Sequence, residues 1–269
     1  MKVYLYIGKK LARYDMYQQY ATLLREKMPS SIEILDDQAD FADVDILHIV
    51  ACWDHHASRL AEKAVKMGIP YIISPMGGIS PWNLYKPRTQ RLIQKFRYQR
   101  SMVRKASAIL ATDELEREFI VESKWNSRVY RVSNCIFTGS IAASDMTHEI
   151  AKVYEDVFQH FEKEHAEKIA AKVNGESAEH KVVEQIMLIY DRMPHQNIPM
   201  NRVKTLKALL YTTEYSDDEV EKILKKVKLT TFAQQLFAAM SKKVELTEGF
   251  MPMAPKNDSR SKTIGKYMK

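Results

Sequence analysis

The chain has 269 residues, of which 45% are hydrophobic and 28% are charged, a composition typical of folded proteins that excludes wholesale disorder. No apolar run approaches the roughly 18–20 residues that a membrane-spanning helix needs. The formal net charge of +7 favours anionic partners but does not choose among nucleic acid, phospholipid and phosphorylated small molecules.

Short β-rich segments alternate with helical segments over the first 140 residues. Strands are expected at 3–7, 32–35, 45–50, 70–74, 107–111 and 128–132, and helices at 12–28, 56–67, 86–105 and 113–123. Gly68 stands where a glycine in the left-handed conformation would end the second helix. Because the strands are mostly apolar, the alternation predicts an α/β fold with a doubly wound, parallel, Rossmann-like sheet and helices on both faces.

Ligands of such sheets bind where the strands end, at the carboxyl edge. This rule marks five stretches of the chain, at 8–10, 51–54, 75–82, 111–113 and 133–136. Since the carboxyl ends of parallel strands meet at one edge, we expect these stretches to form a binding cleft.

The second half of the chain has almost no strand signal. Apolar residues at helical spacing predict a helix over 145–173, ended by Gly175, and further helices near 182–190, near 203–210, from Ser216 and from Thr230 or Thr231. We therefore expect an all-α domain after the sheet. The expected parts are a Rossmann-type domain at 1–140, a helical domain at 141–250 and a flexible basic tail at 251–269.

A series of short motifs runs in order through residues 45–134. The series is DILHI at 45–49, GIPYIISP at 68–75, Gly77 with Pro81-Trp82, KASAILAT at 105–112, ELERE at 114–118 and VSN at 132–134. In this order the motifs resemble the N-terminal, acceptor-side domain of family 4 glycosyltransferases, which have the GT-B fold. The resemblance covers about ninety residues and is looser over the first forty.

The resemblance implies a role in surface polysaccharide synthesis. A protein of this kind transfers, or helps to transfer, a sugar from a nucleotide-sugar donor to a glycan or lipid-linked acceptor. In the family a second Rossmann-like domain binds the donor, but no second strand–helix alternation follows Asn134 here. The alternative is a non-catalytic binding or regulatory module that lacks the donor domain and is completed by a partner subunit. We leave open whether the chain is an enzyme, and we name no catalytic residue; an active form would be a hexosyltransferase-like enzyme.

The expected substrate-binding residues lie at the carboxyl edge of the sheet. They are Gly8, Lys9, Lys10, Trp53, His55, Met76, Gly77, Gly78 and Trp82. The two neighbouring glycines would let a ligand approach the backbone closely, and the two neighbouring lysines would supply charge. Trp82 would either stack on a sugar or cover the sheet.

Two of these positions depart from the family pattern. Met76 stands where the family usually has a histidine, and a thioether cannot transfer a proton. The loop after the first strand, at 8–11, is shorter than the Gly-rich loop of the family. Both departures favour the non-catalytic alternative.

The segment 86–105 contains eight cations and no acid. Four of them fall roughly on one helical side: Arg88, Arg91, Lys95 and Arg104. This pattern predicts either a solvated helix face or a patch facing anionic membrane lipids. Nucleic-acid binding is a less favoured explanation of the basic charge, because no recognised binding motif accompanies it.

Few cysteines and no leader-like segment favour a cytoplasmic protein, peripheral at the inner face of the membrane if the basic segment binds lipid. Cys52 and Cys135 cannot build a disulfide framework. His55 and His56 have no further ligands at metal spacing nearby, so we expect neither a metal nor another cofactor. The expected partners are a nucleotide-sugar, a glycan acceptor and, on the alternative, a protein subunit.

Overall fold

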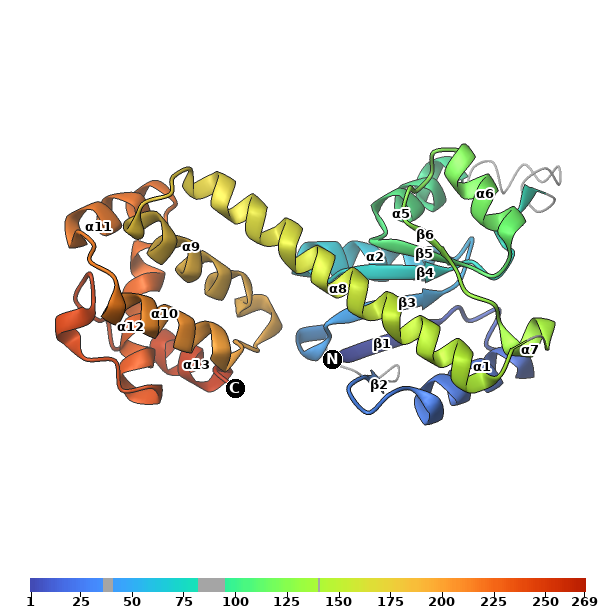
Figure 1. Cartoon of the computed structure of the whole chain (residues 1–269), viewed down its shortest axis with the longest axis horizontal. Helices are drawn as coiled ribbons and strands as arrows, with labels where there is room; N and C mark the ends of the chain where they lie inside the picture. The colour runs from blue at the N-terminus through green and yellow to red at the C-terminus, as the bar shows by residue number, and fades with distance from the viewer. Residues whose placement is uncertain (36–40, 82–94, 140) are drawn as a thin grey trace. The chain divides into compact units, whose positions relative to one another are not determined.

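The structure, a computed structural model, describes residues 1–35, 41–81, 95–139 and 141–269 (Figure 1). The chain divides into two compact units, unit 1 at Met1–Phe161 and unit 2 at Glu162–Lys269. Among the described residues, none of the helices combines the length and the apolar character that crossing a membrane requires.

Unit 1 is built on a six-stranded sheet in the order β2-β1-β3-β4-β5-β6. The strands are β1 (Lys2–Ile7), β2 (Glu33–Leu35), β3 (Ile46–Val50), β4 (Tyr71–Ser74), β5 (Ala108–Ala111) and β6 (Val129–Arg131). All neighbouring pairs are parallel, with Val3 opposite Ile46 and Ile72 opposite Ala108. The expected doubly wound, parallel, Rossmann-like sheet is therefore confirmed.

Helices cover both faces of the sheet (Figure 1). One face packs against α1 (Asp15–Lys27) and the first part of α8 (Ala143–Val173). The other face packs against α2 (His55–Met67), α5 (Arg100–Lys105) and α6 (Glu114–Glu122). Side chains alternate along each strand, so Ile46 joins one buried cluster and Leu47 the other.

The ends of the helices follow from local chemistry. Gly68 adopts the left-handed conformation with φ of 69° and ends α2, as predicted. Asp54 and Asp113 accept backbone N–H groups at the starts of α2 and α6, and Asn134 does so at the start of the short helix α7 (Cys135–Thr138). These caps stand directly after strands, at the carboxyl edge.

Unit 1 extends beyond the boundary expected at 140/141. Met146, Ile150 and Tyr154 of α8 are fully buried in the cluster that covers the sheet. The division between the units falls inside α8, after Phe161. Loss of the strand signal marks the end of the sheet, but the face shared with α1 needs a further helix to cover it, and α8 supplies that layer.

Unit 2 is helical throughout, and the structure describes all of its residues. Besides the end of α8, it contains α9 (Ala178–Asp191), η3 (Met193–His195), α10 (Met200–Thr212), α11 (Asp217–Lys226), α12 (Thr230–Lys243), η4 (Glu248–Phe250) and α13 (Ser259–Tyr267). Its strand-like pairing is limited to an isolated bridge between Ile198 and Met268. The expected all-α region is thus confirmed, and no second parallel sheet forms between residues 141 and 269.

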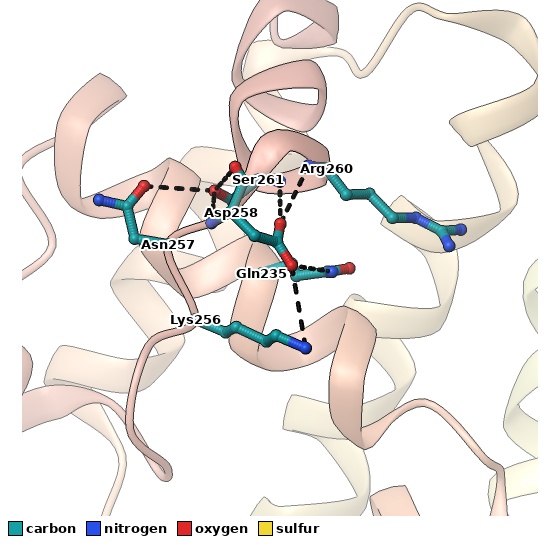
Figure 2. A network of polar contacts seen from close by, with 6 residues as sticks. All are labelled: Gln235, Lys256, Asn257, Asp258, Arg260 and Ser261. Atoms are coloured by element: carbon teal, nitrogen blue, oxygen red, sulfur yellow. Dashed lines mark hydrogen bonds and ion pairs between the residues drawn. The ribbon is translucent and has the colours of Figure 1, made fainter.

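The expectation of a flexible tail at 251–269 is wrong. Residues 259–267 of this segment form α13 (Ser259–Tyr267), in which Ser261 and Ile264 are buried. Asp258 caps the helix through the N–H groups of Arg260 and Ser261, and the Gln235 amide donates to its other carboxylate oxygen at 2.8 Å (Figure 2). The Asp-x-x-Ser capping pattern was present in the sequence, but it lies in a polar stretch that resembles a disordered end.

Candidate functional site at the carboxyl edge of the sheet

The strand order places a topological switch point between β1 and β3. From β1 the chain continues through α1 to β2 on one side, and from β3 it continues through α2 to β4 on the other. Parallel sheets of this kind bind ligands in the crevice outside such a point. The loops that follow β1 and β3 are therefore the first candidates for a binding site.

Gly8 joins these two loops. Its N–H donates to the Val50 carbonyl at 3.0 Å, and a Cβ added at Gly8 would lie 3.0 Å from the Ala51 Cβ and the Asp54 Oδ2. A larger residue would push the loops apart. Lys9 and Lys10 follow at once and are exposed, so their ammonium groups are available to a ligand at the switch point.

Trp53 links the loop after β3 to the loop after β4. Its backbone has a positive φ of 58°, its N–H donates to the buried Gln99 at 2.7 Å, and its indole N–H donates to the Gly78 carbonyl at 2.9 Å. The indole donor is therefore already used within the protein. Trp53 is partly exposed, so a ligand could contact its side chain but not use the indole N–H.

The two glycines after β4, Gly77 and Gly78, have different roles. A Cβ at Gly78 would lie 2.8 Å from both the Cys52 Cβ and the Pro75 carbonyl oxygen, so this glycine allows protein packing rather than ligand approach. Gly77 has φ of 76°, and the atom nearest to a Cβ added there would be the Ser80 Oγ at 3.9 Å. Gly77 is thus the glycine with room beside its backbone.

Met76 belongs to the loop after β4 and contacts the segment after β6. Its φ is 49°, and its sulfur accepts a weak hydrogen bond from the buried Asn134 amide at 3.9 Å. Asn134 also caps α7 through the Ile136 N–H at 2.9 Å. Met76 therefore packs between two strand ends, where its thioether can contact a ligand but cannot transfer a proton.

Glu116 is a residue of the carboxyl edge whose role the sequence did not indicate. It is fully buried and accepts from the backbone N–H groups of Thr112 and Ile79 at 3.3 and 3.4 Å. Burial raises the pKa of its carboxyl, while backbone hydrogen bonds, including one from Gly77, oppose that rise. Its spacing after Asp113 is that of a capping box, but its carboxylate reaches across to the β4 loop and holds the Gly77 segment in place.

His48 lies within strand β3 rather than at the carboxyl edge. It is fully buried, with Nδ1 2.6 Å from the Tyr154 hydroxyl and Nε2 2.7 Å from the Ser74 hydroxyl. Burial lowers the pKa of this imidazole to about 3. The motif histidine is consequently neutral, and it connects β3 to β4 and to α8.

His55 lies at the rim of the edge. It is exposed, and its ring makes an edge contact with Tyr98 at 5.6 Å between centroids. The preceding residue, Asp54, caps α2 through the N–H groups of His56 and Ala57 and accepts from the Tyr6 hydroxyl at 3.2 Å. The first turn of this helix is therefore already occupied by a carboxylate.

The side chains of Trp82, expected at the edge, and of three members of the expected lipid-facing patch cannot be placed. Trp82, Arg88 and Arg91 lie outside the described residues, and only the backbone of Lys95 is described, in η2 (Lys95–Gln99). Arg104 is exposed on α5. The proposed lipid-facing grouping of these cations therefore stays a prediction. Within the described part of the chain, no group of histidine, cysteine, aspartate and glutamate side chains could hold a metal ion.

No protein-family model, curated protein or solved structure matches the chain.

Proposed function

We propose that the chain is a glycosyltransferase-like protein of surface polysaccharide synthesis, whose carboxyl edge binds a glycan or lipid-linked acceptor. The observation that carries the proposal is the switch point between β1 and β3, because the motif series at 45–134 runs through the strands and loops beside it. Lys9 follows β1, Trp53 follows β3, and Met76 and Gly77 follow the adjacent strand β4.

The caps at the edge favour a sugar over a diphosphate as the ligand of the helix starts. A phosphate bound at α2 or α6 would have to displace the Asp54 or Asp113 carboxylate from the same N–H groups and would be repelled by its charge. A hydroxyl group can instead donate to these carboxylates. Any diphosphate at this edge would depend on Lys9 and Lys10.

The second candidate is a non-catalytic module completed by a partner subunit. Residues 162–269 form helices and no second nucleotide-type sheet, so these residues offer no lobe of the kind that binds the donor in the resembled family. Titration with a panel of uridine- and guanosine-diphosphate sugars, followed by a transfer assay with oligosaccharide acceptors, separates the two. Sugar transfer supports an enzyme, and glycan binding without transfer supports the module. Failure to bind either class, alone or with a partner subunit, would contradict both.

For any diphosphate-containing ligand that binds at this edge, a nucleotide-sugar included, replacing Lys9 and Lys10 together by alanine should weaken binding about tenfold at low salt, because each exposed cation contributes about 0.2–1 kcal/mol to an ionic contact. The effect should shrink at high salt. Isothermal titration at two ionic strengths measures it. The control is Arg25→Ala with Lys27→Ala, which removes equal charge from the last turn of α1. Equal affinities of the two double variants would show that the β1 loop has no such role.

A further inference from the structure

Unit 2 carries a groove between α12 and α13 that the proposed function does not use. Its volume is about 270 Å³, and it is lined by Ala238, Ala239, Lys242, Lys243, Ser261, Lys262, Gly265 and Lys266. The two alanines are buried and form the floor with Gly265, whose added Cβ would lie 3.9 Å from the Ala239 Cβ. Small residues thus bring the two helices close together.

The rim of this groove consists of four exposed lysines and no acid among the eight lining residues. We call Lys242, Lys243, Lys262 and Lys266 the lysine rim. The acid that precedes α13, Asp258, is engaged by the helix start, by Gln235 and by Lys256 at 3.9 Å (Figure 2). Its charge is therefore balanced locally, and the rim remains a concentrated positive patch.

The composition of the groove discriminates among anionic partners. Protein interfaces are enriched in aromatic residues and arginine and depleted in lysine, serine and alanine, which is the reverse of this lining. Single-stranded nucleic acid is bound on aromatic platforms, and the lining has no aromatic residue. Lysine ammonium groups are compact, hydrated charges on flexible stems. They suit the phosphates of a lipid surface, because binding there does not require a fixed orientation of the headgroup.

We propose that the lysine rim binds anionic phospholipid headgroups, so that the α12–α13 face of unit 2 is a membrane-contacting surface. The surface is separate in sequence from the basic segment 86–105. The proposal does not rest on sugar transfer, since vesicle binding is measured without substrate. A failure of transfer activity would leave it untouched.

The test is co-sedimentation of the full chain with phosphatidylcholine vesicles and with vesicles containing about one-third phosphatidylserine. Each lysine near an anionic bilayer strengthens binding about fivefold, so changing all four rim lysines to glutamine should weaken binding about 600-fold if their contributions add. The matched control changes Lys222, Lys225, Lys226 and Lys228 to glutamine. These four are exposed on and just after α11, so the control loses the same net charge.

We expect the control and a variant with four rim arginines to bind as the wild type does. Circular dichroism and thermal unfolding of each variant exclude misfolding as the cause of a loss. The proposal is overturned if the rim variant binds within threefold of the wild type, if the α11 control loses binding equally, or if neutral vesicles recover as much protein. Rim-dependent binding to polyglutamate without vesicle binding would likewise overturn it, in favour of an acidic peptide.

Discussion

Glu116→Ala should lower the free energy of unfolding of unit 1 by about 2–4 kcal/mol. Alanine leaves the buried N–H of Ile79 and that of Thr112 without their acceptor, and each unsatisfied buried donor costs about 1–3 kcal/mol. Loss of the desolvated carboxyl offsets part of this cost, since its raised pKa shows that burial disfavours the charge. Denaturant unfolding followed by tryptophan fluorescence measures the change.

The control for this prediction lies on the same helix. Glu118 is exposed, so Glu118→Ala should change the free energy of unfolding by no more than about 0.5 kcal/mol. Glu116→Gln should give an intermediate loss, because an amide keeps one acceptor but also presents a donor to backbone N–H groups. If Glu116→Ala and Glu118→Ala were equally stable, the carboxylate would not be what holds the Gly77 segment.

Lowering the pH from 7 to 5 should destabilise the wild type by about 2 kcal/mol more than the His48→Gln variant. The imidazole has a pKa of about 3 in the folded protein and 6.5 as its ordinary value. Between these values the unfolded chain takes up a proton that the folded chain does not, so stability falls as the pH falls. The contribution is fully present above about pH 6.5 and is lost progressively toward pH 3.

Tryptophan fluorescence follows this transition in unit 1, because Trp53, Trp82 and Trp125 all precede residue 162. Glutamine keeps one donor and one acceptor group toward Tyr154 and Ser74, but it cannot titrate. The His48→Gln variant should be less stable than the wild type at pH 7, and its stability should depend less steeply on pH. Parallel stability curves for the two proteins would show that His48 is not the titrating group.

These two buried polar groups give the candidate site its rigidity. Glu116 connects the loop after β4 to α6, and His48 connects β3 and β4 to α8. Trp53 and Asn134 add links between neighbouring loops through Gly78 and Met76. A ligand at the edge would therefore meet loops whose positions are set before it binds, which lowers the ordering cost of binding.

Most of the architecture of unit 1 could be predicted from the sequence. The apolar runs such as 46–50 and 71–74 became strands, and Gly68 ended α2 as its position indicated. Periodicity reports which face of an element is buried, and strand–helix alternation restricts the possible connections between elements. The carboxyl edge followed from that alternation alone, which is why Gly8, Trp53 and Gly77 could be named as members of adjoining loops.

The roles of the same residues could not be predicted in this way. Gly78 faces Cys52 and Pro75, the Trp53 donor is satisfied by a backbone carbonyl, and Glu116 reaches a loop more than thirty residues away in sequence. Such contacts join segments that no local pattern connects. Only the packed loops decide whether a side chain is left for a ligand.

Local patterns in the chain predict the class of each half, because burial periodicity is a local property of a strand or a helix. The end of unit 1 and the helix at 259–267 are not predicted in this way. Both depend on contacts between elements that are distant in sequence. The first part of α8 packs on a face of the sheet that would otherwise be uncovered. Packing of α13 against α12 stabilises a helix that the polar composition of its own segment does not predict.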